Sequence, residues 1–315
     1  MKPRSWEEVV GQEPAVRLFK RALASGKLAQ TYLLVGPEGT GKKTCVFLLV
    51  NYLFCSESSP CYECTNCQKL SRGVHPDLMV LDPQGENIKI SQVREAENFM
   101  RFRPLEAPAK VILILSAERL TPEAANALLK SLEEPPPYVH FILTAVSTDT
   151  LLPTIVSRSQ VVRFRALPPE LVTKMLIERF GREPEEAQML ALLSEGSLGR
   201  ALSLAEKGLL EELNRVVSAA RMNDPALKLK AAEGLAQRKR DLPELIYLLK
   251  LWLWYSYLKA KGLSEYPRVF PEPAPAEAIK IISFADRILE GLERYANPEL
   301  SLLALILELS CLLQR

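Results

Sequence analysis

Residues 31–54, TYLLVGPEGTGKKTCVFLLVNYLF, place a glycine-rich loop between two apolar segments. The first segment is a short apolar run that ends at Gly36, which is typical of a buried strand, and the segment after Gly41 has the apolar pattern of a helix. The spacing Gly36-x-x-x-x-Gly41-Lys42 is that of a P-loop, whose backbone N–H groups and lysine face phosphates. The motif therefore predicts an α/β domain built around this strand–loop–helix unit.

Further apolar runs predict three more strands, with helices between them. The runs are DLMVLD at 77–82, KVILILS at 110–116 and HFILTAV at 140–146, and helical patterns cover 12–26, 91–101 and 122–133. Alternating strands and helices are typical of a parallel sheet covered by helices, which we expect to end near residue 165. Short helices are expected over 170–206 and longer ones over 209–315, with a proline-rich loop at 266–277.

The length and charge of the chain limit its functional class. A chain of 315 residues exceeds the usual ~100–200 residues of one domain, so two or three domains are expected. Lys and Arg number 40 against 38 Asp and Glu, a net charge of +2, which provides no global field to hold a polyanion. We find no secretory pattern at the start and no apolar run of membrane-spanning length, and we expect a cytoplasmic protein with no membrane partner.

The P-loop departs from that of an active ATPase at one position. The residue whose hydroxyl would hold Mg²⁺ is Lys43, and Thr44 is one residue out of register. A second ammonium group repels the metal but attracts phosphate, so ATP or ADP binding without hydrolysis is the prediction. A turn that merely caps a helix is the alternative. The candidate nucleotide-binding residues of the loop are Gly36, Gly39, Gly41, Lys42, Lys43 and Thr44.

A second departure lies at the end of the strand predicted over 110–116. In an ATPase of this architecture, that strand ends in acidic residues that order Mg²⁺ and polarise the attacking water. The corresponding residues are Leu115 and Ser116, neither of which acts as a base or a charged metal ligand. Glu118, beyond the strand end, is the alternative carboxylate. The departures at Lys43 and at Leu115 and Ser116 therefore both predict the loss of Mg²⁺-assisted ATP hydrolysis.

Four closely spaced cysteines form the candidate metal site. The spacing Cys-x5-Cys-x2-Cys-x2-Cys suits tetrahedral Zn²⁺ in a structural role, because four sulfur ligands leave no open position. In a reducing compartment such a cluster indicates a metal rather than disulfides, and iron–sulfur ligation or free thiols are the alternatives. The candidate ligands are Cys55, Cys61, Cys64 and Cys67, whereas Cys45 and Cys311 are expected in the core.

Several motifs together resemble bacterial clamp-loader AAA+ subunits of DNA polymerase III. They are WEEVVGQ at 6–12, the P-loop, the cysteine cluster, HPDL at 75–78, AANALLKSLEEPP at 124–136, TIVSRS at 154–159 and GSLGRALSL at 196–204. The resemblance spans most of residues 6–204, and residues 297–309 are similar to the last collar helix of the family. The motor subunits of that family keep the P-loop hydroxyl and the acidic pair. The two departures therefore match a non-catalytic subunit.

The resemblance implies three domains and two arginine roles. The domains are a P-loop AAA+ RecA-like parallel-sheet domain at 1–166 with a zinc-binding insertion at 55–67, a small helical lid at 167–208, and an all-α collar at 209–315. Arg158 matches the arginine of the family's SRC motif, which reaches the ATP of a neighbouring subunit, although the motif's cysteine is Ser159 here. Arg200 corresponds to the lid arginine that senses nucleotide in cis, or it pairs with an acidic neighbour.

The implied partners are the gamma/tau motor subunits and delta in a pentameric ring, and, through that ring, the sliding clamp and primed DNA. On this interpretation the chain is a component of a DNA-directed DNA polymerase holoenzyme with no ATPase activity of its own. Two alternatives remain: an active gamma/tau-type motor ATPase of the same complex, and a stand-alone zinc-dependent DNA-binding protein. The second predicts direct, salt-sensitive DNA binding, against which the small net charge argues.

Overall fold

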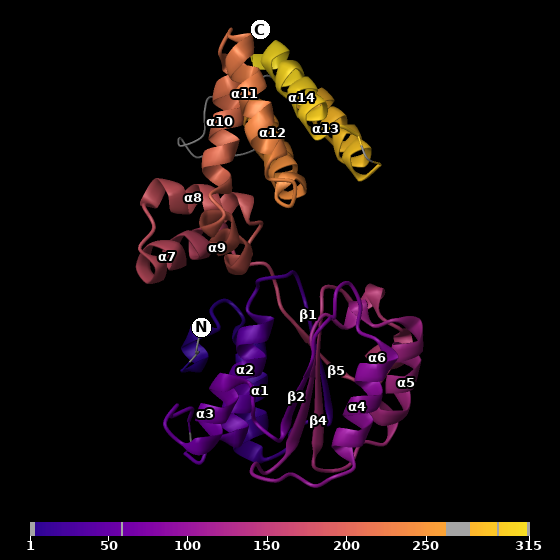
Figure 1. Cartoon of the computed structure of the whole chain (residues 1–315). Coiled ribbons are helices and arrows are strands. Elements are labelled where there is room, and N and C mark those ends of the chain that lie inside the picture. Colours follow the sequence, from indigo (N-terminus) through magenta and orange to yellow (C-terminus); the bar gives the residue numbers. More distant parts are fainter. Residues whose placement is uncertain (1–3, 58, 263–277, 295, 314–315) are drawn as a thin grey trace. The chain divides into compact units, whose positions relative to one another are not determined.

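The computed structural model describes residues 4–57, 59–262, 278–294 and 296–313 (Figure 1). The chain divides into two compact units, Met1–Leu167 and Pro168–Arg315. The proline-rich loop predicted at 266–277 lies outside the described residues.

The first unit contains a five-stranded parallel sheet with the order β2-β3-β4-β1-β5. Its strands are β1 (Thr31–Val35), β2 (Leu78–Leu81), β3 (Lys110–Ile114), β4 (Val139–Ala145) and β5 (Gln160–Arg163). The expected parallel sheet and its four predicted strands are confirmed, and β5 was not predicted. The carboxyl ends of parallel strands meet at one edge, which is where ligands bind in open α/β sheets.

Helices cover both faces of this sheet (Figure 1). One face carries α1 (Glu13–Ser25), α2 (Lys42–Phe54) and α3 (Thr65–Arg72), and the other carries α4 (Ile90–Met100), α5 (Pro122–Glu133) and α6 (Pro153–Ser157). The described residues of this unit also form the short 3-10 helices η1 (Trp6–Glu8), η2 (Ala117–Arg119) and η3 (Thr148–Thr150).

Side chains of β1 alternate between the two cores of this unit. Tyr32 and Leu34 pack with α1 and α2, whereas Leu33 and Val35 pack with α5. Since successive strand residues point to opposite faces, a strand buried on both sides is largely apolar, as residues 32–35 are. The strand ends at Val35, directly before Gly36, so this packing fixes the position at which the P-loop begins.

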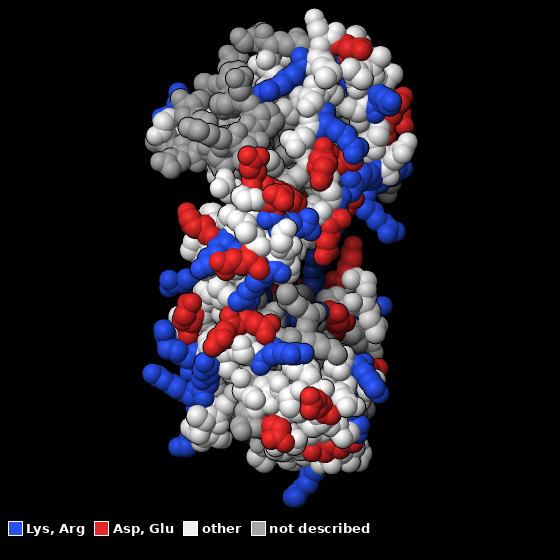
Figure 2. Space-filling model, turned by 90° about the vertical axis from the view of Figure 1, so that its left-hand side faces the viewer, with Lys and Arg blue, Asp and Glu red and all other residues white. Residues whose placement is uncertain are grey.

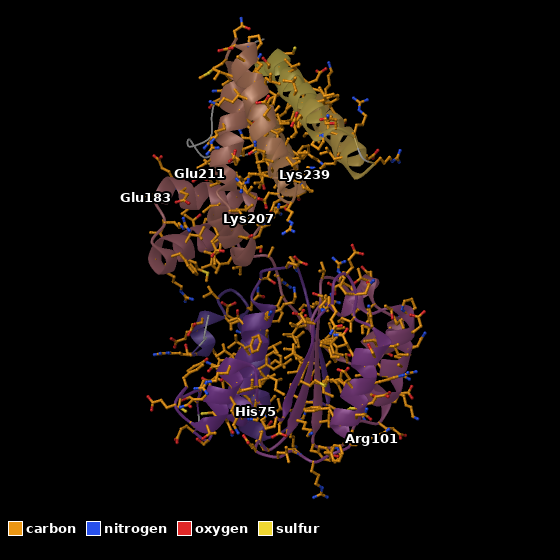
Figure 3. All side chains as sticks on the ribbon, viewed as in Figure 1. His75, Arg101, Glu183, Lys207, Glu211 and Lys239 are labelled. Atoms are coloured by element: carbon orange, nitrogen blue, oxygen red, sulfur yellow. The ribbon has the colours of Figure 1, made fainter. Side chains whose placement is uncertain are left out.

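Every described element of the second unit is a helix, as the sequence predicts. The helices are α7 (Pro169–Phe180), α8 (Pro184–Leu193), α9 (Leu198–Glu206), α10 (Leu209–Arg221), α11 (Pro225–Ala236), α12 (Leu242–Ala260), α13 (Ala278–Glu293) and α14 (Pro298–Leu313). The C-terminal helix α14 packs against α10, α11 and α13. Lys207, which is labelled in Figure 3, follows α9. Its Nζ contacts Glu244 of α12 at 2.7 Å and Asp241 at 3.6 Å.

The surface carries both charge signs, intermixed over the face that Figure 2 presents. Among the described residues, no helix is long and apolar enough to cross a membrane. Cys45 is fully buried, as predicted, because it lies on the side of α2 that faces the sheet. The prediction that Cys311 is a core residue is wrong: it lies on α14 but is exposed.

Candidate functional site

The P-loop connects the carboxyl end of β1 to the first turn of α2. Gly36 continues the sheet, because its N–H donates to Ala145 O at 3.1 Å. Gly39 and Gly41 have φ values of 69° and 96°, in the left-handed region that glycine adopts without strain. The loop thereby leads directly into α2 at Lys42, and the unpaired N–H groups of that first turn are suited to bind an anion.

Lys42 is turned onto the carbonyls of its own loop. Its Nζ donates to Gly36 O and, at 2.7 Å, to Pro37 O. Burial lowers the pKa of Lys42, while the carboxylates of Glu118 and Glu38 act in the opposite direction. The ammonium group of Lys42 therefore lies at the P-loop, as the motif predicts, and carbonyl oxygens of the loop accept its hydrogen bonds.

The positions where an ATPase anchors Mg²⁺ carry no carboxylate. Leu115, directly after β3, is 7% exposed and packs into the core beside α2. Ser116 has a left-handed backbone, with φ 53°, and its N–H donates to Thr144 Oγ1 at 3.0 Å. Lys43, in the first turn of α2, is exposed to solvent. Glu118, on η2, has a buried Oε2 with no hydrogen-bond partner among the described residues.

Arg158 lies at the other end of the sheet from the P-loop. It caps the C-terminus of α6, two residues before β5 begins, and β5 runs parallel to β1 with Tyr32 beside Gln160 and Val35 beside Arg163. The P-loop follows the ends of these strands, whereas Arg158 precedes their starts. β5 has four residues, each of which advances the strand by about 3.3 Å. Arg158 and the P-loop are therefore roughly 13 Å or more apart along the strand direction.

The guanidinium group of Arg158 contacts three groups of its own chain. Nη2 donates to Glu133 Oε1 at 2.5 Å, and Nη1 donates to Thr154 O at 3.1 Å and to Ser157 Oγ at 3.5 Å. The Arg158 side chain is 34% exposed and that of Glu133 is 50% exposed. The arginine is therefore held in place and also accessible from solvent.

Arg200, on α9 in the second unit, is paired with an acidic neighbour. Its Nη1 donates to Glu195 Oε2 at 2.8 Å, and its guanidinium lies 4.6 Å from the centre of the Tyr247 ring. The Tyr247 hydroxyl donates to the same Glu195 oxygen at 2.7 Å. Pairing with an acidic neighbour was one of the two interpretations of Arg200 from the sequence, and Glu195 is such a neighbour. The contacts among Arg200, Glu195 and Tyr247 join α9 to α12.

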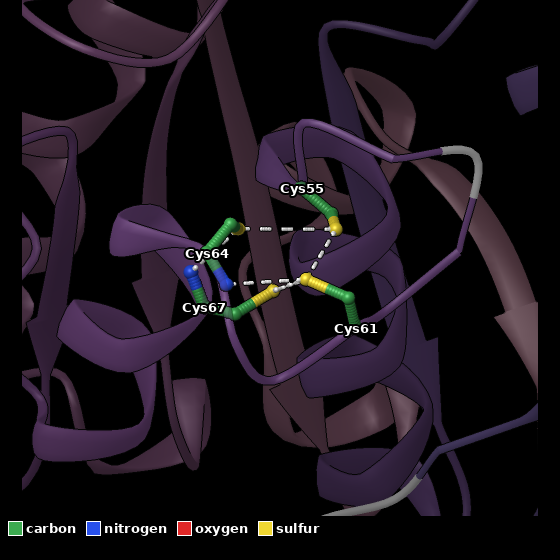
Figure 4. A group of neighbouring side chains, drawn as sticks. All are labelled: Cys55, Cys61, Cys64 and Cys67. Atoms are coloured by element: carbon green, nitrogen blue, oxygen red, sulfur yellow. Dashed lines mark hydrogen bonds between the residues drawn. The ribbon is translucent and has the colours of Figure 1, made fainter.

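The four clustered cysteines come together between α2 and α3 (Figure 4). Their sulfur atoms all lie within 4.8 Å of one another, with 3.5 Å between Cys55 and Cys61, 3.9 Å between Cys61 and Cys67, and 4.0 Å between Cys55 and Cys64. A tetrahedral ion with metal–sulfur bonds of about 2.3 Å needs sulfurs about 3.8 Å apart. The predicted donor set is therefore suited to a single metal ion.

The local fold prepares these sulfurs to act as acceptors. Cys64 caps the N-terminus of α3, where the Cys67 N–H donates to Cys64 Sγ at 3.5 Å, and the Cys64 N–H donates to Cys61 Sγ at 3.3 Å. Burial would raise the pKa of Cys64, but hydrogen bonds from Ser56 and Cys67 outweigh it and lower the pKa to about 6. Burial raises the pKa of Cys67 to about 12. A bound cation would favour the thiolate at every one of these positions.

Sequence reasoning missed several residues around these sites. They are Gln12, whose side-chain Nε2 donates to the P-loop carbonyl Thr40 O at 3.3 Å, Glu133 beside Arg158, and Glu195 and Tyr247 around Arg200. One sequence signal pointed to Glu133: a carboxylate at the C-terminus of a predicted helix, where the helix dipole disfavours it. Gln12 is buried only in the folded chain, so no local signal marked it.

Comparison with known proteins identifies relatives of this chain. The family described as "DNA polymerase III, delta subunit" matches residues 11–168, half of the chain. The DNA polymerase III subunit delta' of Bacillus subtilis is 36% identical over 190 residues, which are 59% of this chain and 57% of that protein. The subunit tau of Escherichia coli is 33% identical over 216 residues, 66% of this chain and 33% of that protein. The matches thus span less than two thirds of the length of these relatives.

A solved structure supports the fold. A DNA polymerase III gamma subunit-related protein from Thermotoga maritima superposes with a TM-score of 0.53 at 22% identity, covering 93% of this chain and 99% of that one. The expected fold class, a P-loop parallel-sheet domain followed by a helical region, is confirmed by this likeness and by the sheet described above.

Proposed function

Because the chain belongs to the DNA polymerase III delta subunit family, we propose that it is the non-catalytic delta-prime subunit of a clamp loader. In this role it is a cytoplasmic component of the DNA polymerase III holoenzyme and helps to load the sliding clamp onto primed DNA during replication. It supplies Arg158 to the ATPase site of a neighbouring motor subunit and hydrolyses no ATP itself. In this proposal the P-loop binds ATP or ADP without hydrolysing it.

The proposed loss of hydrolysis is supported by the side chains around the P-loop. Lys43 stands where a hydroxyl would hold Mg²⁺, and Leu115 and Ser116 stand where carboxylates would order the metal and the water. Both magnesium ligands of a P-loop ATPase are thus replaced, one of them by a cation. The charge of Glu118 acts to raise the pKa of Lys42. Glu118 lies on η2, several residues beyond the end of β3, and not at the position of the missing carboxylates.

The opposite placement of Arg158 and the P-loop is the observation that carries the proposed role in trans. An arginine that precedes β5 is separated from its own P-loop by the length of the strand, yet its side chain remains accessible. A guanidinium that meets the γ-phosphate on another subunit offsets charge that develops in the transition state, an effect worth ~10³–10⁵ in rate. A subunit without hydrolysis can therefore still control a neighbour's rate.

The cysteine cluster is proposed to hold structural Zn²⁺. Four sulfur ligands at tetrahedral spacing complete the coordination shell, which leaves no position for a reacting water. Zn²⁺ bound there would cross-link the segment between α2 and α3 and would have no catalytic role.

The helical unit is proposed to contain two parts, a lid at 167–208 and a collar at 209–315. In this proposal the collar joins the chain to gamma/tau motor subunits and delta in a pentameric ring. The near-neutral charge of the chain favours contact with DNA and the sliding clamp through the assembled ring rather than through this chain alone.

A second candidate is an active gamma/tau-type motor ATPase, which the similarity to the E. coli tau subunit favours. That role requires a magnesium site, which the substitutions at Lys43, Leu115 and Ser116 remove.

Reconstitution with gamma/tau and delta subunits tests the proposed function. We expect Arg158→Ala to lower the DNA-stimulated ATPase of the assembly by at least tenfold, in line with the ~10³–10⁵ range of such arginines, while the ring forms normally. Arg182→Ala is the matched control, since Arg182 also forms an ion pair with a half-buried carboxylate, Glu186, at 3.2 Å. An assembly whose ATPase is the same with and without the Arg158 side chain would remove this role.

A further inference from the structure

Arg158 and Glu133 come from two different helices that end side by side. Glu133 is the last residue of α5, and Arg158 caps α6. Leu132 and Ile155, the buried residues next to this pair, belong to the same hydrophobic core and are 4% and 1% exposed. The backbone on both sides is thus fixed by packing, so the pair stands on a rigid base.

The ion pair between Arg158 and Glu133 contributes little to the folding stability of the chain. Pairs exposed to the extent of Arg158 and Glu133 contribute about 0–1 kcal/mol. A carboxylate in the last turn of a helix opposes the helix dipole, at a cost of about 0.3–1 kcal/mol. The two effects are of similar size and opposite sign. The net contribution of the Glu133 carboxylate to stability is therefore close to zero.

The contacts determine which donors of Arg158 remain available. A guanidinium group has five N–H donors in one plane. Glu133 Oε1 accepts from Nη2, and Thr154 O and Ser157 Oγ accept from Nη1, so contacts on both terminal nitrogens set the direction of that plane. These three contacts use at most three N–H groups, which leaves two for an anion outside the chain.

We propose that Glu133 is a positioning residue for Arg158, which holds the guanidinium plane in the orientation that receives the γ-phosphate of a nucleotide on the neighbouring subunit. The inference rests on the proposed function, because it acts through Arg158. Glu133 contacts no substrate in this account. Its carboxylate keeps one terminal nitrogen fixed, so that the remaining donors meet the phosphate without reorganisation.

The test compares four variants in the reconstituted assembly: Glu133→Ala, Glu133→Gln, Arg158→Ala and the double variant with Ala at both positions. We expect Glu133→Ala to lower kcat for ATP about tenfold, since misplacement of a catalytic group by about 1 Å can cost 10²-fold, while KM for ATP changes less than twofold. Glu133→Gln keeps an oxygen acceptor and is expected to restore at least half of the lost rate. In the absence of Arg158, removal of Glu133 is expected to have no further effect.

Glu186→Ala, which removes the carboxylate of a similarly exposed pair, is the matched control and is expected to leave kcat unchanged. If Arg158→Ala lowers the rate but Glu133→Ala leaves it unchanged or raises it, the positioning role is wrong while the proposed function stands. If Arg158→Ala itself has no effect, the proposed function fails first, and the positioning role fails with it.

Discussion

Gln12 and Arg165 exchange two hydrogen bonds across 153 residues of sequence. Gln12 Nε2 donates to Arg165 O at 2.8 Å, and the Arg165 N–H donates to Gln12 Oε1 at 3.1 Å. The same Nε2 also donates to Thr40 O in the P-loop. One buried amide thus joins the N-terminal segment, the P-loop and the chain that leaves β5.

Gln12→Ala is expected to destabilise the first unit by about 1–3 kcal/mol, because it leaves buried backbone groups without partners. Thermal unfolding measures the change. Gln30→Ala is the control, since the side chain of Gln30 donates an exposed hydrogen bond to Pro135 O at 3.3 Å, and its removal should change stability by less than about 0.5 kcal/mol. Equal losses in the two variants would show that the buried amide has no special role.

Gly36→Ala is expected to destabilise the sheet more than Gly41→Ala. A Cβ at Gly36 would lie 2.2 Å from Phe164 O, so the chain after β5 would have to move away from β1. A Cβ at Gly41 meets no atom within 4 Å, so that variant carries only the strain of its left-handed backbone, about 1 kcal/mol. Urea unfolding of both variants distinguishes steric overlap from backbone strain, and a larger loss in Gly41→Ala would contradict the packing described here.

The purified chain is expected to contain one zinc ion, measured by elemental analysis. Cys61→Ser should abolish zinc binding and lower the Tm, because metal binding at a closed site contributes directly to folding free energy. Cys311→Ser changes an exposed cysteine outside the cluster and should retain both zinc and Tm. Iron in place of zinc, or full Tm in metal-free Cys61→Ser protein, would overturn the structural zinc site.

Asp77 is expected to give the first unit a stability that disappears in acid. Its carboxylate is fully buried and accepts the N–H groups of Leu105, Glu106 and Ala107 at 2.7–2.9 Å. The backbone N–H of Asp77 donates to Nδ1 of His75, which is labelled in Figure 3, at 3.1 Å. Burial alone would raise the pKa of Asp77, but these hydrogen bonds lower it below the ordinary 3.8. Because the folded-state pKa is depressed, the contribution is fully present above pH 4 and is lost as the pH falls through the folded-state value.

Asp77→Asn should therefore cost on the order of 2–3 kcal/mol at neutral pH, with the difference from the unsubstituted chain narrowing below pH 4. Urea unfolding at several pH values measures this difference. A difference that stays constant between pH 7 and pH 3 would contradict the assigned ionisation.

Local pattern predicted most of the sheet but not β5. The segments that became β1, β2, β3 and β4 are short apolar runs bounded by polar residues or by glycine, so the runs themselves predicted the strands. The edge strand Gln160–Arg163 is four residues long and exposed at both ends, which gives no such signal. The strand order likewise depends on tertiary packing, which no single segment encodes.

The candidate sites also contain a part that local sequence predicts and a part that depends on tertiary structure. Short spacing predicted the P-loop and the cysteine cluster, since each lies within one continuous segment and its chemistry requires that spacing. The partners of Arg158 and Gln12 lie 25 and 153 residues away, at Glu133 and Arg165, so only the folded chain brings them together. Residues that position others are thus the ones that the sequence alone conceals.

ATP hydrolysis by the isolated chain tests the central claim most directly. With Mg²⁺ and saturating ATP, we predict no turnover above the background without protein, because Lys43, Leu115 and Ser116 provide no anionic ligand for the metal. Glu118→Gln and Lys42→Ala should leave this background unchanged. Mg²⁺-dependent turnover that either substitution abolishes would show that Glu118 or the P-loop lysine supports catalysis within this chain, and it would contradict the account.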